Sequence, residues 1–332
     1  MKLLAVVINY RTAPMTIEAL RCLVPELRAL PGSRAVVVEN GSGDGSLEAL
    51  AAALRAEGWG DIVSLAASER NRGFAGGINF AVRPALEGAA RPDYVYLLNS
   101  DAFVAPGALR LLLEFLERHR DVAICGSYIH GRAGEPHETA FRFPTILGEL
   151  IAWVPLWPFT PLLRRHAVAM PIPTRPQAVD WLAGASMLIR REVFDSIGLF
   201  DDGFFMYFEE TDFCLRARRA GFPTWYLPES RVAHIGGGST GLLDARRPRP
   251  AYWFESRRRY LRKHHGAPYL WAANAAWVAG FALAQLRRRV KRLPNPNPPR
   301  LLRDFLLHNL LPRPAFSPER DGARLADSPR GG

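Results

Sequence analysis

Residues 3–10 read LLAVVINY, a short run of apolar and β-branched residues that ends in Asn9 and Tyr10. Three later runs have the same design: AVVVEN at 35–40, IVSLAA at 62–67 and YVYLLNS at 94–100. Such runs predict buried β-strands, and the segments 16–30, 46–57, 75–86 and 106–119 predict helices between and after them. The alternation predicts an α/β fold with a mainly parallel central sheet and flanking helices.

Each predicted strand ends in polar or turn residues. They are Asn9-Tyr10, Glu39-Asn40-Gly41-Ser42, Ser68-Glu69-Arg70-Asn71 and Asn99-Ser100-Asp101. Ligands of open α/β sheets bind at the carboxyl ends of the strands, so these residues predict a binding crevice. For any single run, a plain strand end remains the alternative.

The composition indicates a globular protein, because 48% of its 332 residues are hydrophobic. Cys22, Cys125 and Cys214 lie far apart with no CxxC pair, so neither a disulfide framework nor a zinc site is expected, and a reducing cytosol fits. The first residues lack the cleavage site of a signal peptide.

The net charge of +11 is concentrated in the last quarter of the chain. Residues 245–332 contain 19 Lys/Arg and 5 Asp/Glu, a balance of +14, whereas residues 1–244 contain 24 and 27, a balance of −3. Nucleic acid and an anionic membrane surface are both candidate partners of such a tail.

Two glycine-containing motifs follow predicted strands. VVVENGSGDGS forms a tight turn whose polar groups suit a nucleobase and ribose. RNRGFAGGINFAV (70–82) has glycines where a helix begins, so backbone N–H groups can approach a phosphate or a sugar. It is not a GxGxxG motif and does not predict a dinucleotide site.

Two acidic motifs suggest chemistry. In LLNSDAFV (97–104), Asp101 stands at the end of a predicted strand, where a carboxylate with polar neighbours suits a hard divalent cation, although a helix cap explains it almost as well. FFMYFEETDFCLRARRAGF (204–222) sets Glu209, Glu210 and Asp212 after an aromatic run. These carboxylates could serve a reaction, or could only favour the dipole of a helix in its first turn. Asp212 can pair with Arg216 at i+4.

In order, the motifs VVINY, VENGSGDGS, RNRGFAGGIN, LLNSDA, WLAGASMLIRR, FFMYFEETDFCLR and HIGGGST resemble the family 2 inverting glycosyltransferases, within them the bacterial rhamnosyltransferase-like branch. The resemblance covers about residues 1–265. It implies the Rossmann-like GT-A fold, a nucleotide-sugar donor, Mg²⁺ or Mn²⁺ on the diphosphate, and a carboxylate base.

Residue by residue, the resemblance implies that Glu210 is the general base and that Asp101 and His234 bind the metal. Apolar neighbours such as Phe205, Tyr207 and Phe208 would raise the pKa of Glu210 toward the working pH. Glu39 stands where the family usually has an Asp, and Asn99 replaces the first Asp of the metal motif. Expected acceptor or supporting residues are Glu209, Asp212 and Trp181, and expected nucleotide-sugar-binding residues are Asn9, Tyr10, Glu39, Asn40, Ser42, Asp44, Asn71, Gly73, Gly77, Asn79, Asn99 and Ser100.

The basic tail contains an uncharged, alanine-rich run, YLWAANAAWVAGFALAQL, at 269–286. Its 18 residues are the minimum for a membrane span, but it is only weakly lipophilic. We expect an amphipathic helix on the membrane surface with Trp271, Trp277 and Phe281 dipping in; a helix packed on the soluble fold is the alternative. A short amphipathic helix is expected at 301–311.

The predicted organisation is a catalytic domain at 1–245, a basic helical extension at 246–311 and a disordered tail at 312–332. The branch resemblance implies dTDP-rhamnose as the donor, and the expected activity is transfer of L-rhamnose to a lipid-linked or polysaccharide acceptor of the cell envelope. The basic tail predicts a peripheral location at the cytoplasmic face of the membrane. A nucleotide-binding module without catalysis and a basic nucleic-acid-binding protein are the rivals. The tryptophan-rich run between the arginines favours lipid over nucleic acid.

Overall fold

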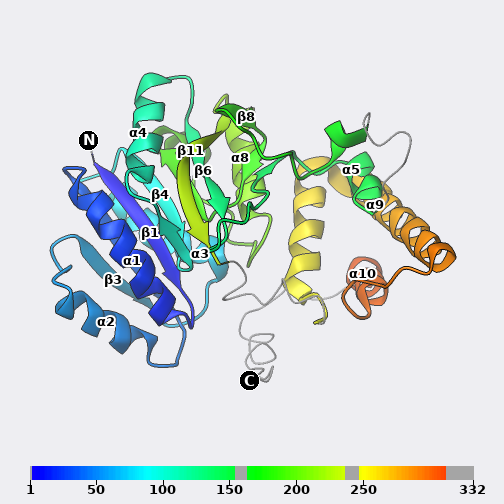
Figure 1. Cartoon of the computed structure of the whole chain (residues 1–332), viewed down its shortest axis with the longest axis horizontal. Coiled ribbons are helices and arrows are strands. Elements are labelled where there is room, and N and C mark those ends of the chain that lie inside the picture. The colour runs from blue at the N-terminus through cyan, green and yellow to red at the C-terminus, as the bar shows by residue number, and fades with distance from the viewer. Residues whose placement is uncertain (1, 154–162, 236–246, 312–332) are drawn as a thin grey trace. The chain divides into compact units, whose positions relative to one another are not determined.

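A computed structural model of the chain describes residues 2–153, 163–235 and 247–311. It divides into two compact units (Figure 1). The first unit comprises Met1–Phe143, Ala169–Gly203 and Glu209–Gly241, and the second comprises Pro144–Val168, Phe204–Phe208 and Leu242–Gly332. The second unit thus includes 144–168 and 204–208, which lie within the catalytic domain predicted at 1–245, and the predicted tail 312–332 lies outside the described residues.

The first unit is an α/β structure. Its helices are α1 (Ala13–Arg28), α2 (Ser46–Ala56), α3 (Gly73–Glu87), α4 (Ala108–Arg118), α7 (Arg191–Ile197) and α8 (Glu209–Arg219). Its strands are β1 (Leu3–Asn9), β2 (Ser33–Asn40), β3 (Val63–Ser68), β4 (Tyr94–Asn99), β5 (Ala102–Val104), β6 (Ile124–His130), β7 (Ala140–Phe141), β8 (Gln177–Val179), β9 (Trp181–Leu182), β10 (Ser186–Arg190) and β11 (Thr224–His234).

The main sheet has the strand order β3-β2-β1-β4-β10-β6-β11-β5, with β8 also paired to β11. Strands β3, β2, β1 and β4 are parallel, as the βαβ pattern predicts. Strand β10 is inserted antiparallel between β4 and β6, and β11 runs parallel to β6. The central α/β sheet with flanking helices is therefore confirmed, with a mixed second half.

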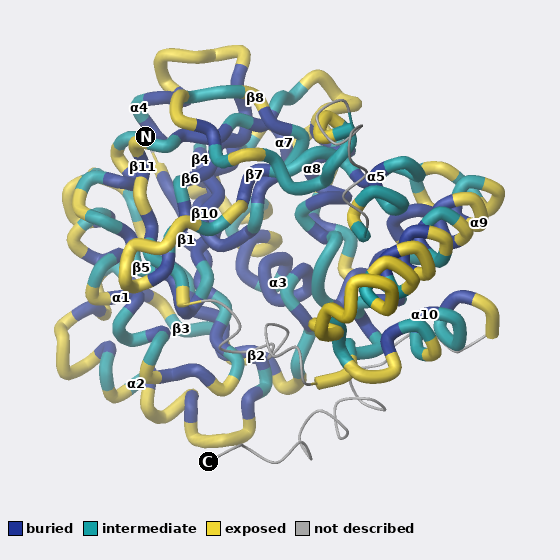
Figure 2. The backbone as a smooth tube through the Cα atoms, turned by 45° about the vertical axis from the view of Figure 1, so that its right-hand side comes forward, coloured by how far each residue is buried: buried dark blue, intermediate teal, exposed yellow. Residues whose placement is uncertain are grey.

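Alternating side chains of β1 feed two cores, one on each face of the sheet. Leu3, Ala5 and Val7 belong to a cluster with residues of α1, α2 and α4. Leu4 and Val6 belong to a cluster with residues of α3, α7 and α8. Side chains point to opposite faces with a period of two, so an unbroken apolar run is what a strand covered on both faces requires. The central strands are accordingly buried (Figure 2).

Several element bounds differ from those predicted. Helix α1 begins at Ala13 rather than at residue 16, because Pro14 is suited to the first helical turn. The apolar run 181–190 contains two strands, β9 and β10, which are separated by residues 183–185. Strand β11 continues to His234, with a register shift between Leu227 and Arg231. His234 of the HIGGGST motif is thus the last residue of a strand.

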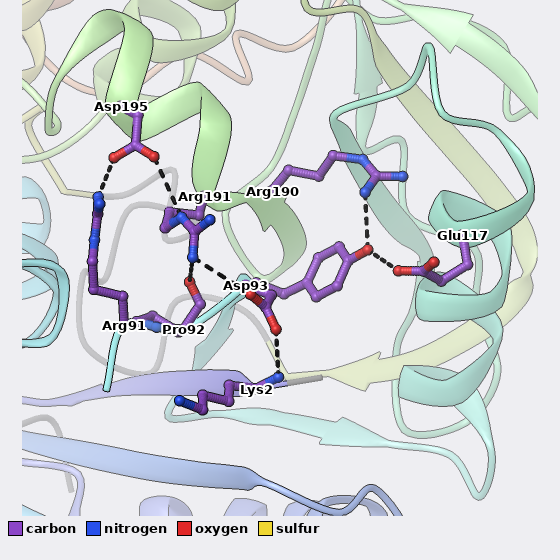
Figure 3. A network of polar contacts seen from close by, with 9 residues as sticks. Lys2, Arg91, Pro92, Asp93, Glu117, Arg190, Arg191 and Asp195 are labelled. Atoms are coloured by element: carbon purple, nitrogen blue, oxygen red, sulfur yellow. Dashed lines mark hydrogen bonds and ion pairs between the residues drawn. The ribbon is translucent and has the colours of Figure 1, made fainter. Parts of the chain in front are cut away.

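The amino end of β4 is held by two groups of polar contacts (Figure 3). In one, Asp93 accepts from the backbone N–H of Lys2 at 2.8 Å and lies 3.4 Å from Arg191 Nη1. In the other, the guanidinium of the buried Arg190 donates to Val122 O and Tyr94 Oη at 2.8 and 2.9 Å. A buried guanidinium is tolerated because its donors find acceptors. These contacts fasten β10 beside β4 at the edge opposite the strand ends that carry the candidate site.

The second unit consists of helices α5 (Ile146–Ile151), α9 (Ala251–Lys291) and α10 (Leu301–Leu310) with the short 3₁₀ turn η1 (Arg164–His166). Helix α9 is interrupted at Gly266, whose φ of +84° is not helical. Its buried Arg257 lies 2.9 Å from Glu149 of α5 and donates to Asn274 Oδ1 at 2.7 Å. The helix predicted at 301–311 is confirmed by α10.

One expectation for the tail was wrong. Trp277 and Phe281 do not face outward: they are buried and pack against Trp153, with Trp277 stacked on Phe305 of α10 at a centroid distance of 3.8 Å. A single uncharged run does not reveal which of its faces a neighbouring helix covers. Trp271 is half exposed, as expected. Among the described residues, no helix combines the length and apolar character needed to cross a bilayer.

Candidate functional site

The polar ends of the parallel strands lie side by side at one edge of the sheet. Asn9 of β1 is in register with Glu39 of β2, and Ile8 with Asn99 of β4. Asn40 is in register with Ser68 of β3. This arrangement follows from the parallel pairing, because consecutive strands then end at the same edge.

The side chain of Asn40 ties the end of β2 to the start of α3. Its Oδ1 accepts from Arg72 N at 3.1 Å, and its Nδ2 donates to Gly73 O at 3.0 Å and to Asn71 Oδ1 at 3.2 Å. Gly77 packs against this amide, since a Cβ there would lie 3.4 Å from Asn40 Nδ2. Asn40, Asn71, Gly73 and Gly77 thus form one strand-to-helix corner.

The turn after β2 is equally close-packed. Ser42 N donates to Glu39 Oε1 at 2.8 Å, and Ser42 Oγ accepts from Arg11 N at 2.9 Å. Gly41 has a φ of +71°, and a Cβ on it would lie 2.4 Å from the carbonyl carbon of Arg70. The longer side chain of Glu39 therefore closes its own turn, while Gly41 lets the neighbouring loop approach.

Gly41→Ala is expected to destabilise the protein by more than about 2 kcal/mol, because a left-handed φ costs about 1–2 kcal/mol and the clash with backbone adds to it. Gly43→Ala is the matched control: Gly43 also has a positive φ, +61°, but a Cβ there meets nothing within 4 Å. Urea unfolding of both variants measures the difference. Equal losses would contradict the close approach at Gly41.

Asn9 is fully buried beneath the strand ends. Its Oδ1 accepts from Thr16 Oγ1 at 2.8 Å, and its Nδ2 lies 3.4 Å from Ser42 Oγ. Thr12 Oγ1 lies 3.3 Å from Asn9 Oδ1 and 3.1 Å from Ser100 Oγ. Asn9 and Ser100 are consequently joined through Thr12, in a network that links β1, β2, α1 and the end of β4.

Three other predicted binding residues are engaged within the first unit. Asp44 Oδ1 accepts from Ser46 N at 3.1 Å and from Ser46 Oγ at 2.6 Å, at the start of α2. Asn79 exchanges two hydrogen bonds with the backbone of Phe200, at 2.8 and 3.1 Å. Tyr10 is half-buried, with the Arg11 guanidinium 5.2 Å from its ring centroid. The amide of Asn79 is thereby committed to the loop before α8.

Asp101 and His234 meet, although 133 positions separate them in the sequence. His234 Nε2, at the end of β11, lies 3.0 Å from Asp101 Oδ1 and 3.3 Å from Asn99 Nδ2. Strand β5 brings them together, because its Ala102 is in register with His234. Asn99 Oδ1 is buried and has no hydrogen-bond partner among the described residues.

These atoms fit a divalent cation. The 3.0 Å between Asp101 Oδ1 and His234 Nε2 matches the separation of adjacent ligands around an octahedral ion with bonds of about 2.1 Å. Carboxylate oxygen and imidazole nitrogen are suitable ligands for Mn²⁺. Within the described residues, no three His, Cys, Asp or Glu side chains are placed so that together they could hold a metal ion, so water and phosphate oxygens would fill the other positions.

Glu210 is linked to the end of β4 through residues 184 and 185. Its Oε1 accepts from Gly184 N at 3.0 Å, and the next residue, Ala185, accepts through its carbonyl from Asn99 N at 3.2 Å. A Cβ on Gly184 would lie 2.8 Å from Glu210 Oε1 and 2.9 Å from the ring of Phe74. Gly184 and Ala185 thus contact three groups: the carboxylate of Glu210, the ring of Phe74 and the end of β4 at Asn99.

Glu209 and Glu210 form a carboxylate pair at the start of α8. Burial raises the pKa of Glu209 well above its ordinary value, and the adjacent Glu210 raises it further. Burial also raises the pKa of Glu210, but its hydrogen bonds from backbone N–H groups, including that of Gly184, oppose the rise. A side-chain hydrogen bond joins the two. Glu209 is 2% exposed, whereas Glu210 remains partly exposed, so the pKa of Glu209 is raised more strongly by burial.

Glu209→Gln is expected to flatten the pH dependence of stability. Because the folded pKa of Glu209 is raised, its stabilising state is fully present below about 4.5 and is lost as pH rises toward the folded pKa. In that window the wild type loses about 1.4 kcal/mol per pH unit from this group. Urea unfolding at pH 5 and pH 7 measures the slope, and identical slopes in variant and wild type would refute a protonated Glu209.

The remaining predicted residues have structural contacts. Asp212 is fully buried and pairs with Arg216 at 2.8 Å, as predicted from their spacing. Arg216 also donates to the carbonyls of Ile197 and Leu199. Trp181 donates to Arg142 O at 2.9 Å and stacks on Phe141 in the small β7–β9 sheet.

The predicted aromatic surroundings of Glu210 belong to the second unit. There, Phe205 lies 5.6 Å from the ring of Tyr252, and Phe208 lies 5.6 Å from the ring of Tyr260. Sequence analysis missed Gly184, Phe74 and Thr12. The run WLAGASMLIR contains the signal for Gly184, which is a small residue just before the buried strand β10. The loop GGGST at 236–240 lies outside the described residues.

Residues 2–266 match the model of a family described as glycosyltransferase-like family 2. The chain is similar to the N-acetylglucosaminyl-diphospho-decaprenol L-rhamnosyltransferase of Mycobacterium tuberculosis, with 28% identity over 203 residues, 58% of this chain and 62% of that protein. It is also similar to the rhamnosyltransferase WbbL of Escherichia coli, with 28% identity over 44% of this chain and 53% of that protein. The matches thus span less than two thirds of either relative.

Two solved structures share the fold. One is a mannosyltransferase of Pyrobaculum calidifontis in complex with GDP-Man and Mn²⁺, with a TM-score of 0.53 and 17% identity, covering 98% of this chain and 80% of that chain. The other is GalNAc-T7 with UDP, GalNAc and Mn²⁺, with a TM-score of 0.51 and 20% identity, covering 70% of this chain and 44% of that chain. The likeness confirms the predicted GT-A fold class.

Proposed function

Given that the chain belongs to glycosyltransferase family 2, we propose that it transfers L-rhamnose from dTDP-rhamnose to a lipid-linked acceptor, with inversion at the anomeric carbon. The observation that carries this is the meeting of Asp101 with His234 at 3.0 Å, with Glu210 linked to the neighbouring Asn99 through Gly184 and Ala185. The rhamnosyltransferase relatives favour this sugar, and the first of them acts on a diphospho-decaprenol acceptor.

The nucleotide-sugar would occupy the edge formed by the ends of β1, β2 and β4. Glu39, Asn40 and Ser42 shape the turn where a base and ribose would lie, and the corner at Gly73 would form the wall near a phosphate or sugar. The N–H groups of Arg72 and Gly73 donate to Asn40 and Asn71 and hold that corner in shape. Asn9, Ser100 and Asn79 support this edge from below through their internal hydrogen bonds. The role of Asn9, Ser100 and Asn79 is therefore to position this edge of the sheet. Tyr10 and Asn99 would contact the nucleotide-sugar itself.

Asp101 and His234 would hold Mg²⁺ or Mn²⁺, with Asn99 Oδ1 as a nearby unpartnered acceptor. When bound, such an ion supplies positive charge to offset the negative charge on the leaving diphosphate. The backbone holds Asp101 and His234 close together, because β5 and β11 pair with Ala102 opposite His234. A preorganised pair loses little conformational entropy when the donor binds.

Glu210 would take the proton from the acceptor hydroxyl. The acceptor oxygen forms its bond to the anomeric carbon as the bond from that carbon to the diphosphate oxygen breaks on the opposite face, which inverts the configuration. A general base must be ionised, and its pKa must lie close to the pH at which the enzyme works. A proton on Glu209 would permit this, because it would leave only one negative charge in the pair, and burial raises the pKa of Glu209 well above its ordinary value.

The exposed face of α9 suits a peripheral contact with an anionic membrane. Leu283, Leu286 and Val290 are 47%, 59% and 75% exposed and lie at i, i+3 and i+7, on one side of the helix. Arg287, Arg289, Lys291 and Arg292 flank them and are exposed as well. An apolar stripe bordered by cations is the pattern of a helix lying in the membrane interface. Leu283, Leu286 and Val290, rather than the buried Trp277 and Phe281, would therefore enter the membrane interface.

A donor panel tests the proposal. The full chain is incubated with dTDP-rhamnose, UDP-glucose or GDP-mannose, with Mn²⁺ or with a chelator, and with a prenyl diphosphate-linked N-acetylglucosamine. We expect the dTDP donor to raise the melting temperature only with metal, and rhamnose to appear on the lipid. If another donor both stabilised the protein and gave transfer, the sugar of that donor would replace rhamnose in the proposal. If no donor gave transfer, the enzymatic proposal would be overturned.

A further inference from the structure

The second unit contains a groove where α9 ends and α10 begins. It has a volume of about 470 Å³, within the range of about 300–1,000 Å³ typical of small-molecule sites. Its polar lining consists of the side chains of Gln285, Arg289, Asn295, Asn297, Arg300 and Arg303. Pro298 and Pro299 form part of the wall and stiffen it.

Two buried hydrogen-bond donors in this groove have no partner among the described residues. They are Gln285 Nε2 and Asn297 Nδ2. The loop that carries Asn297 is ordered by Asn295, whose Oδ1 accepts from Asn297 N at 3.2 Å and lies 3.5 Å from Arg288 Nη1. Buried polar groups in native proteins are nearly always paired. Two unpaired donors in one groove therefore indicate a ligand with acceptor atoms.

The positive charge of the groove indicates that this ligand is an anion. Within the described residues, no carboxylate lies within ion-pair distance of Arg289 or Arg300, whereas Arg303 pairs with Asp304 at 2.7 Å. From residue 256 to residue 311 the chain has twelve Lys/Arg and a single acidic residue, Asp304. Guanidinium groups beside amide donors are the usual partners of phosphate oxygens.

The groove also opens onto the apolar stripe of α9. Leu286 belongs to both, since it lines the groove and is 59% exposed. A phosphate attached to a hydrocarbon chain would match this juxtaposition, with its oxygens on the donors and its chain along Leu283 and Leu286. We propose that the groove binds the phosphate group of an amphiphilic lipid, an inference that rests on the proposed membrane contact of α9.

Vesicle sedimentation of the full chain tests this site. Arg289→Gln is compared with Arg287→Gln, which removes the same charge two residues away on the same helix but outside the groove. On phosphatidylcholine vesicles containing phosphatidylglycerol, we expect the first variant to lose about tenfold in affinity and the second less than about threefold. Gln285→Met combined with Asn297→Ala changes no charge and is expected to lose about threefold or more.

Two further comparisons show which lipid supplies the phosphate and which of the two proposals fails if binding is not as expected. Vesicles of phosphatidylcholine alone, with or without a prenyl diphosphate-linked sugar, show whether the phosphate is that of the acceptor or that of a membrane lipid. Equal affinity of all variants for vesicles that bind the wild type would overturn the groove while leaving membrane contact intact. If the wild type binds neither kind of anionic vesicle, both proposals fail. Circular dichroism confirms that each variant is folded.

Discussion

Glu210→Gln is expected to lower the rate of sugar transfer by about 10²–10⁴-fold, the usual contribution of a positioned general base, while leaving nucleotide-sugar affinity unchanged. Glutamine keeps the volume of the side chain and the hydrogen bond from Gly184 N, so the geometry around Asn99 is preserved. Only the ability to accept a proton is lost. Transfer is measured with the best donor of the panel, and donor affinity by thermal shift.

The pH profile of the wild type adds a second readout. The base acts when ionised, so kcat/KM is expected to rise with pH, with its midpoint above 4.5 because burial raises the pKa of Glu210. Asp212→Asn is a control for lost charge in the same helical turn: it should impair stability through Arg216 without shifting this midpoint. A Glu210→Gln enzyme with nearly wild-type turnover would remove Glu210 from the role of base.

His234→Ala and Asp101→Asn are each expected to weaken metal-dependent donor binding by at least about 100-fold, since even partners one step removed from a metal cost about 10–100-fold. Each variant removes one of the two atoms that lie 3.0 Å apart. Donor affinity is titrated at several Mn²⁺ concentrations, and excess metal should restore part of it.

His130→Ala serves as the matched control for the histidine. It lies at the end of β6 and its Nδ1 is 2.8 Å from its neighbour Gly131 O, with no role in the proposed site. It should bind Mn²⁺ and donor like the wild type. If His234→Ala retained the metal dependence of the wild type, the assignment of His234 as a ligand would be wrong, and Asp101 would need another partner.

Sequence patterns predicted the parallel half of the sheet well, for a physical reason. Strands β1 and β4 are covered on both faces, so their apolar runs are continuous and end abruptly at polar residues such as Asn9 and Asn99. The parallel crossovers then bring those ends to one edge without further information. The pairing of Asp212 with Arg216 was accessible too, because it depends only on helical spacing.

Long-range contacts were not accessible in this way. Asn79 bonds to Phe200 across 121 positions, so its spacing could not distinguish a ligand contact from an internal brace. Strand β10 runs antiparallel between β4 and β6, and its position beside Asn99 is what brings Gly184 and Glu210 to the site. No local pattern specifies such an insertion.

The tail shows the same limit in another form. Hydrophobic content predicted a helix at 269–286, but not that Trp277 would be covered by Phe305 from a segment nearly 30 positions later. The face left exposed, with Leu283, Leu286 and Val290, is defined only after α10 has packed.

The most direct test of the central claim, that Asp101, His234 and Glu210 serve one nucleotide-sugar site, is anomalous scattering from crystals grown with Mn²⁺ and dTDP. We predict a Mn²⁺ peak within bonding distance of Asp101 and His234, with the diphosphate beside it and the Glu210 carboxylate facing the vacant sugar position. A Mn²⁺–dTDP complex bound elsewhere on the chain would contradict the account.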